Sequence, residues 1–193
     1  MSTVNPTPGH EEPFLKSEPH TEGVDVARQK TPPKNLADAM IKGLRPKQWV
    51  KNVLVLAAPL AAGAESFNSR TAVDILLAFV VFCFGASSIY LINDARDVES
   101  DRLHPTKRFR PIASGMLPIN LAYAMAAVLI AAALGLSLLA TDGASLAWVI
   151  GIYIALQLGY CFGWKHIPVI DIALVSSGFM LRTMAGGVAA GID

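Results

Sequence analysis

Cysteine and surplus charge are both scarce in this sequence. The two cysteines, Cys83 and Cys161, lie inside apolar runs, where a thiol usually packs as a small buried side chain. They therefore indicate neither a disulfide framework nor a zinc site. The net charge is only +1, whereas proteins that bind duplex nucleic acid concentrate positive charge to neutralise many phosphates. The sequence thus predicts no nucleic-acid partner.

Apolar residues are abundant but unevenly distributed. They make up 53% of the chain, which is high for a soluble domain, yet residues 1–38 are polar and rich in proline. Such a segment buries too little apolar surface to offset the entropy of ordering, so we predict a disordered cytoplasmic tail over 1–38. Its layout is not that of a cleaved secretory signal. Residues 39–193 are predicted to form one transmembrane domain.

Five apolar stretches approach the roughly 20 residues that a helix needs to cross a hydrocarbon core about 30 Å thick. They predict an all-α, multi-span transmembrane helical bundle, with a short amphipathic helix from Leu36 lying on the membrane surface before the first span. The predicted spans cover about 53–62, 73–92, 119–140, 146–162 and 168–190. The first of them follows the polar segment 45–52.

The positions of lysine and arginine predict the orientation of the bundle. Short cytoplasmic loops carry an excess of these residues. Basic residues lie before the first span, in the loop after the second (Arg96, Arg102, Lys107, Arg108 and Arg110) and after the fourth (Lys165), whereas the other two loops contain only Arg70. We therefore expect a multi-pass protein of the inner (plasma) membrane, with its N-terminus and the two basic loops in the cytoplasm.

A row of acidic residues ends the second predicted span. Asp94, Asp97 and Asp101 are spaced i, i+3 and i+7, so they share one helix face, with Asn93 at its margin. Magnesium binds one or two carboxylates together with phosphate oxygens, so this face is a candidate site for Mg²⁺ that holds a diphosphate. The alternative is a charged helix end whose acids only pair with Arg96, Arg102 and Arg108.

The cations near this face have two interpretations as well. Lys107, Arg108 and Arg110 could bind phosphate or only anchor the loop at anionic headgroups. Gln48 could bond a substrate oxygen or mark the membrane interface. Asp171 and Arg182 are eleven residues apart and share one face of the fifth span, where charges normally face the bundle interior.

The pattern Asn-Asp-x-x-Asp-x-x-x-Asp over 93–101, followed by Arg-Pro-x-x-Ser-Gly over 110–115, resembles the first aspartate-rich motif of the UbiA superfamily of intramembrane prenyltransferases. The segments 45–52 and 104–113 are most similar to its phosphoribosyl branch, the decaprenyl-phosphate phosphoribosyltransferases of actinobacteria. The resemblance implies nine helices and a second polar motif in the full protein. This chain, with about five helices, is therefore expected to be the N-terminal part of a catalytic domain.

The resemblance also implies an activity. It implies transfer of 5-phosphoribosyl from phosphoribosyl pyrophosphate to decaprenyl (polyprenyl) phosphate, which makes the lipid precursor of the arabinose donor for cell-wall arabinan. Asn93, Asp94, Asp97 and Asp101 would be catalytic and hold Mg²⁺. The predicted substrate-binding residues are Lys47, Gln48, Lys51, Asn52, Lys107, Arg108, Arg110, Lys165 and Arg182.

Two other functions stay open at the level of sequence. The first is prenyl transfer from prenyl diphosphate to an aromatic acceptor, with the same metal role for the aspartates. The second is a transporter or channel subunit, although its ionisable residues should then lie along several helices near mid-membrane. The expected partners are the two substrates and the lipid bilayer, and a homo-oligomer is among the allowed assemblies.

Overall fold

The computed structural model describes residues 31–63, 68–164 and 167–192, and within them every regular element is helical. The elements are α1 (Leu36–Leu44), η1 (Pro46–Leu56), α2 (Ala57–Ala62), α3 (Ser69–Arg96), α4 (Val98–Leu103), η3 (Lys107–Phe109), α5 (Ile119–Ser137), α6 (Gly143–Cys161) and α7 (Pro168–Ala190). The all-α class is therefore confirmed. Residues 1–30 of the predicted tail lie outside the described residues, and the last three residues of that tail, 36–38, belong to α1.

Four of these helices, α3, α5, α6 and α7, are long and apolar enough to cross a membrane. They correspond to the second to fifth predicted spans. The first predicted span, 53–62, differs, because it consists of the end of η1 followed by α2 and is not among the candidate membrane-spanning helices of the described residues. A 3₁₀-helix rises about 2.0 Å per residue and an α-helix about 1.5 Å. The 17 residues of η1 and α2 therefore extend about 31 Å, close to the hydrocarbon thickness of about 30 Å.

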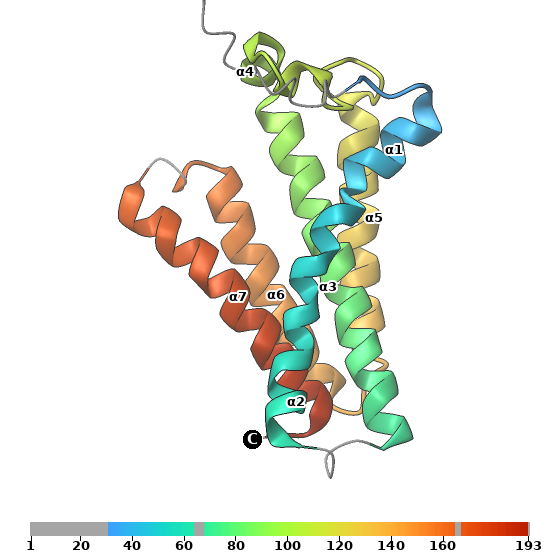
Figure 1. Ribbon diagram of the computed structural model, residues 1–193, viewed down its shortest axis with the longest axis vertical. Helices are drawn as coiled ribbons and strands as arrows, with labels where there is room; N and C mark the ends of the chain where they lie inside the picture. Colours follow the sequence, from blue (N-terminus) through green and yellow to red (C-terminus); the bar gives the residue numbers. More distant parts are fainter. Residues whose placement is uncertain (1–30, 64–67, 165–166, 193) are drawn as a thin grey trace, which may run out of the picture.

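Helix α3 is the centre of the bundle, and it contacts α5, α6, α7 and η1 (Figure 1). Small residues allow close packing along it. A Cβ atom at Gly85 would lie 2.9 Å from the Cδ1 atom of Ile150, and the rings of Phe82 and Tyr153 have centroids 5.1 Å apart. By contrast, few residues of α5 are fully buried, as expected for a helix that faces lipid on one side.

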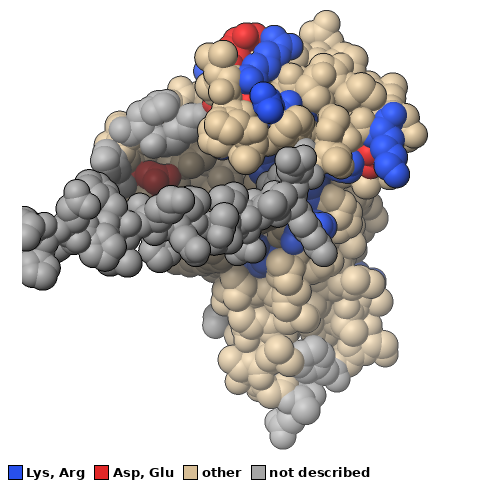
Figure 2. All heavy atoms as spheres, turned by 45° about the horizontal axis from the view of Figure 1, so that its top comes forward, with Lys and Arg blue, Asp and Glu red and all other residues tan. Residues whose placement is uncertain are grey.

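The two ends of the bundle differ in charge. Helices α1 and α4 lie at one end, whereas α2 and the C-terminus lie at the other (Figure 1). In α1, Asn35 caps the N-terminus, and Lys42 forms an ion pair with Asp38 at 2.8 Å. The hydrogen bond from Lys42 and one from the backbone of Lys34 lower the pKa of Asp38. Lysine and arginine side chains are prominent at the surface of this end (Figure 2).

Helix η1 runs between α3 and α7 and contacts both. Residues three apart eclipse one another in a 3₁₀-helix, so Trp49, Asn52 and Val55 form one straight row. The Trp49 indole donates to Ser87 Oγ at 3.0 Å on α3, and Asn52 and Val55 are buried. At Gly186 of α7 an added Cβ would overlap the carbonyl of Val55. The backbones of η1 and α7 are therefore in direct contact.

Candidate functional site

The acidic motif lies where α3 passes into α4. Asp97 is in a turn between them, with φ −87° and ψ 7°. Helical hydrogen bonds nevertheless continue across the junction, because the Asp97 amide donates to Asn93 O at 2.9 Å and the Asp101 amide donates to Asp97 O at 2.8 Å. The helical spacing that the sequence predicts is therefore retained across the break.

Asp94 and Asp101 meet at a single arginine. The Nη1 group of Arg110 donates to Asp94 Oδ1 at 3.1 Å and to Asp101 Oδ2 at 2.6 Å. Both carboxylates are buried, with 3% and 2% of their residue surfaces exposed. A buried carboxylate needs such partners, because an unpaired charge away from water is very costly.

Arg45 approaches Asp94 from another direction. Its Nη2 group donates to both carboxylate oxygens of Asp94, at 2.6 and 2.7 Å, and its guanidinium lies 4.8 Å from the centre of the Tyr90 ring. Asp94 therefore has two arginine partners. We refer to Arg45, Asp94, Asp101 and Arg110 as the acid–arginine cluster.

The sequence analysis did not include Arg45 among the site residues. Arg45 ends α1 in the left-handed conformation, with φ 53°, and directly precedes Pro46. A proline disfavours helical backbone at the residue before it, so the Arg-Pro pair does mark a break between two helices. That signal locates the turn, but it does not reveal that the side chain reaches a carboxylate 49 positions along the chain.

Asp97 is placed differently from the other two aspartates. Its Oδ2 atom accepts a hydrogen bond from Asn93 Nδ2 at 3.1 Å. Within residues 31–63, 68–164 and 167–192, no three His, Cys, Asp or Glu side chains gather as a metal-binding group. Three of the four carboxylate oxygens of Asp94 and Asp101 accept hydrogen bonds from Arg45 or Arg110, so a divalent ion would replace some of these arginine contacts. Metal binding by all four motif residues stays a prediction.

Among the described residues, the other predicted cations are not part of the cluster. Lys47, Lys51, Lys107 and Arg108 have exposed side chains, and Lys165 lies outside the described residues. In the 3₁₀ geometry of η1, Gln48 and Lys51 share one row, whereas Lys47 lies on another. An α-helix would instead have placed Lys47 and Lys51 on the same face.

Asn52 and Arg182, both predicted to bind substrate, contact each other, and their binding of substrate stays a prediction. Arg182 Nε donates to Asn52 Oδ1 at 2.8 Å, and Asn52 Nδ2 lies 3.3 Å from Cys83 Sγ. Cys83 is eleven residues before Asp94 on α3, which is about 16 Å along a helix. Their contacts therefore place both residues deeper in the bundle than the acid–arginine cluster.

Among the described residues, the arginines named in the alternative interpretation form one ion pair with an acid of segment 93–101, between Arg102 and Glu99. Arg96 donates to the carbonyl of Cys161 at 3.1 Å, and its guanidinium lies 4.3 Å from the centre of the Phe162 ring. Arg102 pairs with Glu99 at 3.0 Å. The buried acids are neutralised by Arg45 and Arg110, which come from the turn before η1 and the loop before α5. Two separate segments of chain thus converge on the motif.

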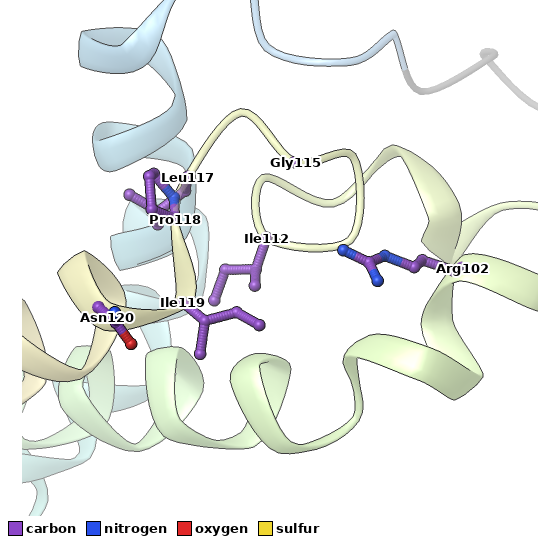
Figure 3. Close-up of a pocket in the computed structure, with 7 residues that line it drawn as sticks. All are labelled: Arg102, Ile112, Gly115, Leu117, Pro118, Ile119 and Asn120. Atoms are coloured by element: carbon purple, nitrogen blue, oxygen red, sulfur yellow. The ribbon is translucent and has the colours of Figure 1, made fainter.

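A pocket of about 390 Å³ opens beside α4 (Figure 3). Ile112, Leu117 and Ile119 form apolar parts of its wall, and Arg102 and Asn120 contribute polar groups. Arg102 also donates to the carbonyl of Ala113 at 3.3 Å, which ties α4 to the loop that carries Arg110. The pocket lies along this loop, on the side where Arg102 is located. The described residues that line it include neither Asp94 nor Asp101.

Replacement of Arg110 tests the cluster as a structural unit. Arg110→Gln leaves two buried carboxylates without their shared cation, so we expect a loss of about 3 kcal/mol or more in unfolding free energy. The midpoint of thermal unfolding of the purified protein in detergent measures this loss. Arg108→Gln, two positions earlier on an exposed side chain, is the matched control and should change stability by less than about 0.5 kcal/mol. Equal midpoints for the two variants would contradict the role assigned to Arg110.

Comparison with known proteins shows similarity to one family and to several curated proteins. The sequence pattern of the UbiA prenyltransferase family matches residues 52–193. The chain is 75% identical to the decaprenyl-phosphate phosphoribosyltransferase of Corynebacterium glutamicum over 181 residues, which are 93% of this chain and 54% of that protein. It is 60% identical to the protein of the same name from Mycolicibacterium smegmatis, over 83% of this chain and 51% of that protein.

The protein of that name from Mycobacterium tuberculosis is 52% identical over 86% of this chain and 54% of its own length. The chain therefore spans about half the length of the curated relatives that it matches.

Proposed function

Because the chain belongs to the UbiA prenyltransferase family, we propose that it carries the first aspartate motif of an enzyme that transfers 5-phosphoribosyl from phosphoribosyl pyrophosphate to polyprenyl phosphate. Three relatives that are 52 to 75% identical to this chain have the name decaprenyl-phosphate phosphoribosyltransferase. The observation on which the proposal depends is the acid–arginine cluster at the basic end of the bundle. Its buried carboxylates and guanidinium groups are suited to a metal-bound diphosphate.

The proposed reaction exchanges one bond at the anomeric carbon of ribose. The bond from this carbon to the pyrophosphate oxygen breaks, and the pyrophosphate leaves with the electron pair. A phosphate oxygen of the lipid supplies the electron pair of the new bond. The acceptor is already anionic at neutral pH, so no general base is required, and catalysis depends on positioning and on stabilising the leaving group.

The residues of the cluster have distinct proposed roles. Asp94 and Asp101 would hold Mg²⁺, which neutralises the charge that develops on the pyrophosphate. Arg45 and Arg110 would bind phosphate oxygens, because a guanidinium has five N–H donors and Arg110 uses Nη1 for its two carboxylate contacts. Asn93 would orient Asp97, to which it donates at 3.1 Å.

We also propose an orientation for the molecule in the plasma membrane. The cluster, α1 and the basic loop after α4 lie at one end of the bundle, so this end is assigned to the cytoplasm by the positive-inside rule. A soluble donor reaches the cluster from that side. The isoprenoid tail would lie along apolar helix surface, with its phosphate at the interface.

Direct assay of the complete enzyme tests the proposal. Membranes containing it should convert labelled phosphoribosyl pyrophosphate and polyprenyl phosphate into a ribosylated lipid, and EDTA should abolish the product until Mg²⁺ is restored. Membranes without the protein provide the control. Absence of this product together with prenylation of an aromatic acceptor would favour the other reaction known for the family fold.

A further inference from the structure

Arg182 is a buried cation without a carboxylate partner among the described residues. Only 6% of its surface is exposed. It donates to three neutral acceptors, namely Asn52 Oδ1 at 2.8 Å, Tyr153 Oη at 3.2 Å and the carbonyl of Gly178. A charge within a membrane span is expensive and is rarely retained without a role.

Aromatic rings complete the surroundings of this guanidinium. Its central carbon lies 5.8 Å from the ring centre of Phe82, 5.1 Å from that of Tyr153 and 5.9 Å from that of Phe179. Cation–π attraction lowers the cost of such burial. Through these contacts Arg182 joins α7 to α3, α6 and η1, so it lies where four helices of the bundle meet.

A second contact between α7 and η1 lies one helical turn further along both helices. Asn52 bonds to Arg182, and the backbone of Val55 touches Gly186. Three residues of a 3₁₀-helix rise about 6 Å, and four residues of an α-helix also rise about 6 Å. The two helices run in the same direction (Figure 1). The spacing of the two contacts on α7 therefore fits η1 only when η1 has the 3₁₀ rise.

The 3₁₀ conformation of η1 also determines which side chains lie in one row in its first half. Arg45, which immediately precedes η1, holds Asp94, and Gln48 and Lys51 share one row in the 3₁₀ geometry. The Ser87 hydroxyl donates to the carbonyl of Leu44 at 2.8 Å and accepts from Trp49, which fixes this end of η1 to α3. A return of η1 to the α-helical form would shorten it and turn Lys51 by about 60° relative to Gln48.

We infer that Arg182 is a positioning residue that, through Asn52, keeps η1 in the 3₁₀ form and thereby sets how Arg45 meets Asp94 and where Gln48 and Lys51 lie along η1. This inference rests on the proposed function, because it assigns these three residues to the phosphate-binding side of that site. Arg182 itself does not touch the donor in this arrangement. Its effect on binding is transmitted through the bond to Asn52.

A double-mutant cycle in the complete enzyme tests the inference. Arg182→Gln and Asn52→Ala should each raise KM for phosphoribosyl pyrophosphate about tenfold, the effect of losing a hydrogen bond to a charged group, while kcat changes little. The double variant should match the single variants, because both remove the same bond. Asn52→Asp retains an acceptor for Arg182 and should restore KM relative to Asn52→Ala. Effects that multiply, or an unchanged KM, would overturn the inference.

A second measurement needs no turnover. Lys51→Cys introduces a thiol at an exposed position, whereas the native Cys83 and Cys161 are buried. In this background, Arg182→Gln and Asn52→Ala should change the rate of maleimide labelling by the same factor. An unchanged rate in both would show that Arg182 does not control η1. If labelling changes but the unsubstituted enzyme makes no ribosylated lipid, the proposed function fails and the positioning role stands.

Discussion

Asp94→Asn should reduce phosphoribosyl transfer at least about 100-fold, the scale expected when a preorganised electrostatic group is removed from a reaction centre. Asp94 accepts hydrogen bonds from Arg45 and Arg110 and is almost fully buried. The asparagine keeps the volume of the side chain but removes the negative charge that would hold the metal. Initial rates at saturating Mg²⁺, normalised to the amount of folded protein, measure the effect.

The matched control for this experiment is Asp74→Asn. Asp74 is another buried aspartate of α3, at the end of the helix near Arg70, and its Oδ2 atom accepts a hydrogen bond from the Thr141 hydroxyl. Its replacement should leave the rate per folded molecule within about twofold, because distant sites act independently. If Asp94→Asn retained full activity, the metal-binding role of this carboxylate would be wrong.

Gly186→Ala should destabilise the bundle more than any other glycine substitution near η1. The added Cβ would overlap the carbonyl oxygen of Val55 and lie 2.7 Å from its carbonyl carbon. Both are backbone atoms, so η1 or α7 would have to move, and overpacking of this kind costs about 1–3 kcal/mol or more. We expect a lower midpoint of thermal unfolding and a smaller yield of monodisperse protein.

The neighbouring glycine provides a close comparison. At Gly187 an added Cβ would come no nearer than 3.8 Å to the side chain of Ala58, which is ordinary contact. Gly187→Ala should therefore be tolerated, and it benefits from the higher helix propensity of alanine. Similar midpoints for the two variants would show that η1 and α7 are not in the close contact described above.

The acidic motif illustrates how far the sequence could predict the candidate site. The spacing of Asp94, Asp97 and Asp101 predicted a common helix face, and the hydrogen bonds across Asp97 retain that helical spacing. However, the prediction could not separate Asp97, which pairs with Asn93, from the two acids that meet at Arg110. Rotamers and partners of neighbouring side chains depend on which other segments pack against the helix.

By contrast, the sequence did not predict how the polar residues at the start of the first predicted span are arranged. Lys47, Gln48, Lys51 and Asn52 were predicted as one group of substrate-binding residues, yet the 3₁₀ form of η1 distributes them over different rows and turns Asn52 toward Arg182. Local propensity does not favour a 3₁₀-helix of 11 residues, because such runs are usually short. Contacts with α7 therefore decide the conformation of this segment.

The sequence by itself determined the membrane-spanning architecture and the helical acidic motif, since long apolar runs and short-range helical periodicity are local properties of the chain. Only the tertiary structure decided the partners: Arg45 with Asp94, Arg110 with both buried acids, and Arg182 with Asn52. The last pair is 130 positions apart in the chain. Such contacts arise from the need to neutralise buried charge once the helices have packed, and local sequence periodicity contains no information about which distant groups will meet.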